Sequence, residues 1–72
     1  MRTIRITTEW IQLQELLKLA GAVRSGGEAK ERIQSGQALL NGQPCTARGK
    51  KLRPGDTVTF AGEQFEIAYA DR

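Results

Sequence analysis

Residues 25–58 constrain the fold of this chain most, because signals for a helix, a strand, a turn and a loop follow one another there at short intervals. The capping-box pattern S-x-x-E predicts a helix over Ser25–Ser35, and Gly36 supplies the left-handed position that ends it. A short apolar strand, Ala38–Leu40, comes next and runs into Asn41-Gly42, a strong signal for a tight turn. The segment therefore predicts one short helix that leads directly into β-structure.

The residues before this segment predict an edge strand and a first helix. Basic and apolar residues alternate over Arg2–Ile6, as in a short half-buried strand. Thr7 and Thr8 are candidate N-caps for a helix over Glu9–Ala20, which Gly21 would end. The residues at i, i+3, i+4 and i+7 of this helix form the apolar stripe expected to face a core: Leu13, Leu16, Leu17 and Ala20.

The residues after this segment predict further strands. Apolar and polar residues alternate over 57–60 and again over 64–69, and Ala61-Gly62 between them can close a hairpin. Pro54-Gly55-Asp56 predicts a turn before the first of these strands. The chain is thus expected to be α+β, with two packed short helices followed by a small, mostly antiparallel β-sheet, and residues 1–72 are expected to form a single domain.

Composition argues against several kinds of function. The chain has no histidine and a single cysteine, Cys45, so we expect no metal site, no intrachain disulfide and no cysteine nucleophile activated by a base. The carboxylates of Glu63, Glu66 and Asp71 have no sequence context for paired acid–base work. No segment resembles a signal peptide or a membrane span. We therefore expect a reduced, cytoplasmic protein that is not an enzyme and that uses no cofactor, small-molecule substrate or membrane.

Positive charge is concentrated in one loop. The net charge of +3 is weak evidence for any partner, but residues 41–56 hold four cations against one carboxylate, whereas residues 57–72 are slightly acidic. The four cations are Arg48, Lys50, Lys51 and Arg53. Guanidinium groups can fork onto phosphate oxygens, and Gly49 lets the backbone approach a phosphate closely. The loop therefore predicts a contact with a polyanion, with an ordinary solvated turn as the alternative; Leu52 is expected in the core and Asp56 in its turn.

Three more cations lie around the second predicted helix. Arg32 follows Glu28 by four residues, the spacing of a helical ion pair, so Arg32 is expected to be structural. Arg24 and Lys30 are better candidates for contact with a polyanion, and helix solubility is the alternative role for each. Ser25 is expected to cap the helix rather than to contact a ligand.

Trp10 and Tyr69 each have two possible roles. Either ring could stack on a nucleic-acid base. For Trp10 we favour burial, because its large apolar surface usually anchors a small core. Gln12 and Gln14 could form hydrogen bonds with a ligand, although exposed glutamines are ordinary on a helix.

The spacing of these residues resembles that of a known family, the small RNA-binding domain named after ribosomal small-subunit protein four, which carries the αL motif. The matching positions are Gly21, Ser25, Ala29, Ile33, Gly36, Leu40-Asn41-Gly42, Leu52, Gly55-Asp56 and Val58. Ser-Gly-Gly at 25–27 and Arg-Gly-Lys-Lys-Leu-Arg-Pro-Gly-Asp at 48–56 further resemble the compact stand-alone bacterial members. The match covers Leu13–Val58 and is fairly specific as a spaced set, although each element alone is weak.

The resemblance implies a stand-alone RNA-binding module with the αL fold. Its implied ligand is structured RNA of the rRNA or tRNA class, and association with the ribosome is one option. The implied contacts are the cations of the second helix and of the loop: Arg24, Lys30, Arg48, Lys50, Lys51 and Arg53. Gln12 and Gly26 stand where many family members have arginine, so RNA contact by this chain is expected to depend more on these six residues.

Two alternatives stay open on the sequence. One is a protein-interaction module whose basic face binds an acidic partner, which a lack of affinity for any RNA would favour. The other is a fragment of an enzyme, because related domains are appended to pseudouridine synthases and tRNA synthetases. The absence of histidine, and of a catalytic neighbour in the chain, argues against the second alternative.

Overall fold

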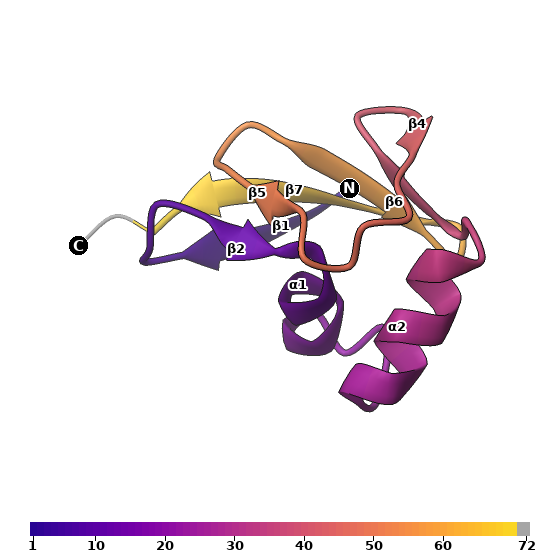
Figure 1. The fold of residues 1–72 in the computed structure, drawn as a ribbon. Coiled ribbons are helices and arrows are strands. Elements are labelled where there is room, and N and C mark those ends of the chain that lie inside the picture. The colour runs from indigo at the N-terminus through magenta and orange to yellow at the C-terminus, as the bar shows by residue number, and fades with distance from the viewer. Residues whose placement is uncertain (71–72) are drawn as a thin grey trace.

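A computed structural model describes residues 1–70 of the chain; Asp71 and Arg72, which entered the charge count above, lie outside the described residues. Two short helices pack on one face of a five-stranded sheet, and a separate two-stranded ribbon lies beside the first helix (Figure 1). The elements are β1 (Arg2–Ile6), β2 (Ile11–Gln12), α1 (Leu13–Leu19), α2 (Gly26–Gln34), β3 (Ala38–Leu40), β4 (Gln43–Pro44), β5 (Lys51–Leu52), β6 (Thr57–Phe60) and β7 (Glu63–Tyr69). This arrangement confirms the predicted α+β class.

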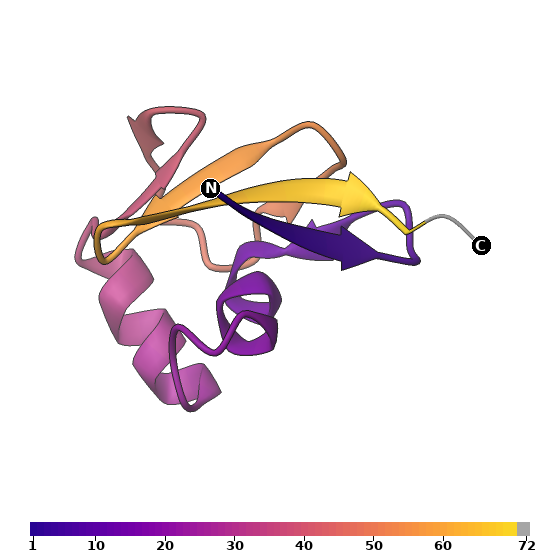
Figure 2. The same ribbon diagram turned by 180° about the vertical axis from the view of Figure 1, so that it is seen from behind.

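The main sheet has the strand order β1-β7-β6-β3-β4. β1 and β7 pair in parallel, so that Ile4 lies opposite Ile67, and the other three pairs are antiparallel. The sheet is therefore mostly antiparallel, as predicted, and β1 lies at its edge with Ile4 and Ile6 buried and its arginines exposed. Figure 2 shows β1 and β7 in front, on the side of the molecule opposite the ribbon of β2 and β5.

Both helices end at the predicted glycines. Gly21 and Gly36 have φ angles of 75° and 84°, which is the left-handed conformation that follows a helix C-terminus. The residue after each glycine then donates its backbone N–H to a carbonyl of the last helical turn, at 2.9 Å after α1 and at 3.2 Å after α2. The predicted second helix is confirmed, with Ser25 and Ser35 as its two caps.

Two tight turns close the antiparallel hairpins. The φ angles are 51° and 85° at Asn41-Gly42, and 54° and 79° at Ala61-Gly62. Positive φ at both central residues is typical of the type I′ turn, whose twist matches the flanking strands. Both turn predictions are confirmed. Asn41 tolerates this conformation well, whereas the Cβ atom of Ala61 makes it sterically unfavourable.

The core lies between the helix pair and the sheet. The predicted apolar stripe of the first helix is confirmed, since Leu13, Leu16 and Leu17 have no exposed surface and Ala20 is buried. Ala29 and Ile33 of α2 are also fully buried. The other buried apolar residues come from the strands and their connections: Ile4, Ile6, Val23, Ala38, Leu52, Val58, Phe60, Phe65 and Ile67.

The predicted start of the first helix was wrong, because α1 begins at Leu13 and not at Glu9. Neither Thr7 nor Thr8 caps it, and the Thr8 hydroxyl instead donates a hydrogen bond of 2.7 Å within the preceding turn. Gln12 occupies the N-cap position without a side-chain capping bond. The reason is tertiary, because β2 pairs with the distant β5 and this pairing overrides the local helical pattern.

Candidate nucleic-acid interface

The basic loop, residues 48–53, is fixed to the start of α1. The backbone N–H of Leu13 donates to the carbonyl of Lys50 at 2.9 Å, and that of Gln14 donates to the carbonyl of Arg48 at 3.0 Å. These two bonds satisfy amides that a helix leaves without partners in its first turn, and they take the place of a side-chain cap. The antiparallel pairing of β2 with β5 continues the attachment. The backbone of the basic loop is therefore held in place on a packed helix.

All six cations predicted to contact RNA are exposed, and none makes an ion pair with a carboxylate of residues 1–70. Three other cations do make ion pairs: Arg2 with Glu63 at 3.5 Å, Lys18 with Glu15 at 3.1 Å, and Arg32 with Glu28 at 3.3 Å. Arg5, on the edge strand β1, is also without a paired carboxylate in this part of the chain. An exposed and unpaired cation keeps its charge available to an external anion.

Asp56, the one carboxylate among residues 41–56, is used inside the fold. Asp56 Oδ2 accepts a hydrogen bond from the backbone N–H of Arg53 at 2.8 Å, and Oδ1 accepts one from the Asn41 side chain at 3.1 Å. This confirms that Asp56 belongs to its turn. Leu52 is fully buried, as predicted, and anchors the loop from within. Both features fix the backbone around the cations without neutralising their side chains.

The start of α2 uses its polar residues for capping. Ser25 Oγ accepts a hydrogen bond from the backbone N–H of Glu28 at 3.1 Å, which confirms the predicted cap. Glu28 Oε1 accepts from the backbone N–H of Arg24 at 2.7 Å, one residue earlier than in the reciprocal capping box. This bond, and after it the contact with the Arg32 guanidinium, hold the pKa of the Glu28 carboxyl below its usual value.

Arg32 has the structural role that its spacing predicted. Besides the ion pair with Glu28, its guanidinium carbon lies 4.8 Å from the centre of the Phe60 ring. Its Nε donates to the side-chain oxygen of Gln37 at 3.0 Å. These contacts tie α2 to the sheet, and they leave Arg24 and Lys30 as the unpaired cations of this helix region.

The six cations lie on two parts of the fold. Arg48, Lys50, Lys51 and Arg53 share the basic loop, which rests on the start of α1. Arg24 precedes α2 and Lys30 lies within it. In both ribbon views the beginning of α2 lies at the end of the molecule away from the sheet, and the basic loop lies nearer the sheet (Figures 1 and 2). A continuous strip that joins the two groups stays a prediction.

The prediction that Trp10 is buried was wrong. Its side chain is 36% exposed and lies outside the core, and Lys51 Nζ is 4.7 Å from the centre of its ring. The pairing of β2 with β5 explains this, because Ile11 packs against the core and directs its neighbours outward.

Two other side chains with more than one possible role also lie on the surface or near it. Tyr69 is 55% exposed at the end of β7. The Gln12 side-chain oxygen accepts from the Gln14 amide at 2.8 Å.

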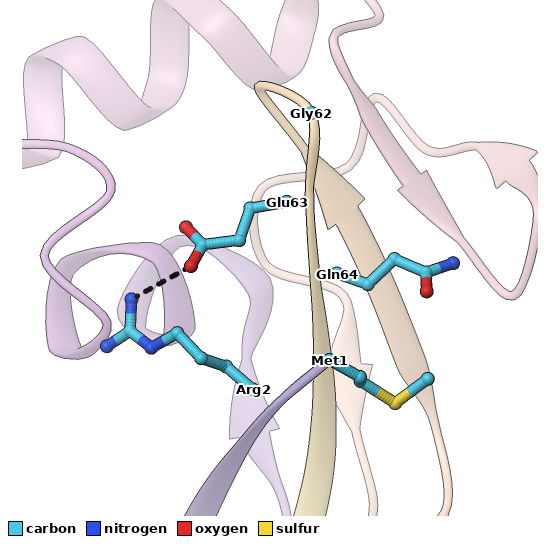
Figure 3. A pocket seen from close by; sticks show the side chains of 5 residues that line it. All are labelled: Met1, Arg2, Gly62, Glu63 and Gln64. Carbon is cyan, nitrogen blue, oxygen red and sulfur yellow. Dashed lines mark hydrogen bonds and ion pairs between the residues drawn. The ribbon is translucent and has the colours of Figure 1, made fainter.

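A shallow hollow is lined by Met1, Arg2, Gly62, Glu63 and Gln64, where an ion pair joins the arginine to the glutamate (Figure 3). Within residues 1–70 no group of three or more acidic, cysteine or histidine side chains is placed to hold a metal ion. In the same range, no helix has both the length and the apolar character that a membrane span requires.

Two short helices, a loop docked on the first of them and a small sheet together define a class of compact α+β domains. The chain belongs to the S4 domain family, whose model matches residues 4–68. This confirms the family resemblance drawn from the residue spacing.

Two bacterial proteins are similar to the chain over most of their length. The chain is 44% identical to the probable ribosome maturation protein RlbA of Bacillus subtilis, over 82% of this chain and 83% of the relative. It is 39% identical to the putative RNA-binding protein YbcJ of Escherichia coli, over 79% and 81% respectively. The solution structure of that YbcJ, described as revealing an αL motif involved in RNA-binding, superposes with a TM-score of 0.66 at 33% identity. The superposition covers 93% of this chain and 84% of YbcJ.

Proposed function

We propose that this chain is an RNA-binding module with no enzymatic activity of its own. The observation that carries the proposal is the set of exposed cations without carboxylate partners among the described residues: Arg24, Lys30, Arg48, Lys50, Lys51 and Arg53. The names of the two bacterial relatives, one a putative RNA-binding protein and the other a probable ribosome maturation protein, support it. The αL motif ascribed to the similar solution structure supports it further.

The basic loop is suited to phosphate contact on physical grounds. Free RNA carries a condensed atmosphere of counterions, and protein cations that bind its phosphates release those counterions, which supplies most of the non-specific affinity. A loop already fixed by hydrogen bonds to α1 loses little conformational freedom when RNA binds. Arg48 and Arg53 can each donate hydrogen bonds to two oxygens of a phosphate, while Lys50 and Lys51 act as point charges.

Structured RNA is the ligand that this surface fits best. The cations are attached to a rigid folded backbone. Cations held in this way recognise the spacing of phosphates and the shape of a folded RNA rather than the edges of bases in a helix. The rRNA or tRNA class, with association with the ribosome, is supported by the name of the Bacillus subtilis relative. The cytoplasm is the compartment in which such a ligand would be met.

The proposal takes residues 1–72 as one RNA-binding domain. The hydrophobic core that both helices and the sheet share supports this, because it links the helix cations and the basic loop to the same packed residues. The lack of enzymatic activity is supported by the composition, since the sequence has no histidine and its single cysteine has no base beside it in the sequence.

Binding to a folded RNA at several salt concentrations tests the proposal against the acidic-protein alternative. The full chain is titrated into a labelled rRNA hairpin, and polyglutamate of similar charge serves as the matched polyanion without phosphate. We expect the logarithm of the RNA association constant to fall linearly with the logarithm of salt concentration. Tight binding to polyglutamate with no affinity for the hairpin at low salt would overturn the proposal and favour the acidic-protein partner.

A further inference from the structure

The ribbon of β2 and β5 has an outward face that the proposed function does not yet use. Ile11 pairs with Leu52, which is fully buried, and Ile11 itself packs against the core. Side chains alternate between the two faces of a strand, so the paired Gln12 and Lys51 point away from the core. Trp10 directly precedes β2, and the short distance between its ring and Lys51 Nζ, 4.7 Å, shows that it shares this outward face.

The partly exposed indole of Trp10 leaves an aromatic surface on this face. Both phenylalanine side chains, Phe60 and Phe65, are buried in the core, whereas Trp10 and Tyr69 are exposed, and exposed apolar surface is unfavourable in water. The Lys51 ammonium covers part of the ring, but an exposed cation–π contact is weaker than the stacking of a nucleic-acid base on an aromatic side chain. A base could therefore displace the ammonium, and Lys51 would then be free to meet a phosphate.

We infer that Trp10 is a stacking site for an unpaired base of the bound RNA. Lys51 and the adjacent exposed Arg53 contact the phosphates on either side of that nucleotide. The inference rests on the proposed RNA-binding function. It specifies in addition that the bound RNA has a single-stranded nucleotide next to a folded region. A base pair inside a helix is excluded as the occupant because both of its faces are covered within the helical stack. Lys51 belongs both to this site and to the basic loop, so the two contacts are continuous.

The chain provides a direct signal for this site, because Trp10 is its only tryptophan. A base that stacks on the indole should quench the tryptophan fluorescence of the unmodified protein. Two ligands separate the contributions: a blunt RNA hairpin whose two strands are joined by a non-nucleotide linker, so that it has no unpaired base, and the same hairpin extended by a short oligouridine tail. We expect strong quenching only with the tailed hairpin, and an affinity for it that is higher by at least about fivefold, the lower end of the range for one base–aromatic stack.

Three variants locate the effect. Trp10→Ala should remove the advantage of the tailed hairpin, measured as the ratio of its affinity to that for the blunt hairpin. Trp10→Phe should restore most of the advantage, because it keeps an aromatic face. Tyr69→Ala, which removes the other exposed aromatic ring, should preserve the advantage.

The outcomes distinguish a failure of the stacking site from a failure of the proposed RNA-binding function. Equal affinity for the two hairpins, with no quenching by the tail, would overturn the stacking site and leave RNA binding intact. Because the fluorescence measurement uses the unmodified chain, it decides the question even if Trp10→Ala fails to fold. Binding to neither hairpin would overturn the proposed function and the stacking site together.

Discussion

Replacing Lys50, Lys51 and Arg53 together with alanine should weaken RNA binding and flatten its dependence on salt. The three side chains are exposed and have no carboxylate partner within residues 1–70, so the change removes charge without breaking an ion pair. The bonds that hold the loop to α1 use backbone carbonyls, and these remain. The substitution at Lys51 also removes the cation–π interaction with the exposed Trp10 ring. We therefore expect the free energy of unfolding to change by less than about 1 kcal/mol.

The size of the salt effect follows from the number of loop cations. If each of the four contacts one phosphate, with a slope of about 0.9 per contact, the affinity should fall by about 150-fold between roughly 50 and 200 mM salt. The triple variant keeps only Arg48 in the loop, so the same change in salt should reduce its affinity by about 3.5-fold. If Arg24 and Lys30 also bind phosphates, they increase the salt effect on the unmodified chain and on the triple variant by the same factor. The two salt effects should therefore differ by about 40-fold.

Fluorescence anisotropy of a labelled rRNA hairpin at several salt concentrations measures both slopes. The matched control replaces Arg2, Arg5 and Lys18 with alanine, which removes the same amount of charge outside the basic loop. Arg2 and Lys18 are already paired with carboxylates. An unchanged slope in a folded loop variant would refute the assignment. An equal effect of the control variant would refute it as well, because net charge alone would then explain the binding.

Four further predictions concern individual side chains. Ser25→Ala removes the α2 cap and should lower the free energy of unfolding by about 1 kcal/mol, seen as a lower Tm; an unchanged Tm with weaker RNA binding would contradict the capping role. Ala61→Asn should raise the Tm by about 3 °C, because asparagine tolerates the positive φ at this position better, whereas a lower Tm would contradict the strain argument. The pKa of Glu28 is lower in the folded state, so its stabilising effect is present above the pKa of the unfolded chain and is lost as the pH falls through the folded value; acid titration of Glu28→Gln should show a smaller loss of stability than the unmodified chain, and identical profiles would contradict this. Replacing Arg24 and Lys30 with alanine should weaken RNA binding cumulatively with the loop variant while thermal melting stays nearly unchanged, and wild-type affinity would confine the interface to the loop.

The parts of the fold set by local chemistry could be predicted from the sequence. Gly21 and Gly36 end their helices because few other residues adopt a left-handed conformation easily. The two type I′ turns and the Ser25 cap are also specified within a few residues of chain. The i, i+4 spacing of Glu28 and Arg32 likewise identified the one cation of the second helix that is used within the fold.

The parts set by contacts between distant segments could not be predicted in this way. The start of α1 depends on Ile11 pairing with Leu52, and no residue near Glu9 reports that pairing. The same pairing turns Trp10 outward, although its size favours burial. The parallel pairing of β1 with β7 joins the two ends of the chain, and no turn signal specifies it. The continuity of the RNA-binding surface from Lys30 to the loop depends on tertiary placement in the same way.

The docking of the basic loop on α1 links the fold of this domain to its proposed function. α1 has no side-chain cap, and the carbonyls of Arg48 and Lys50 accept hydrogen bonds from its first amides instead. The backbone bonds that begin the helix are therefore the bonds that hold two of the proposed RNA contacts in position. The side chains of these two residues remain exposed and take no part in those bonds. Charge on the loop can thus vary with little effect on folding, whereas a change in the loop backbone would disturb the helix and the proposed binding surface together.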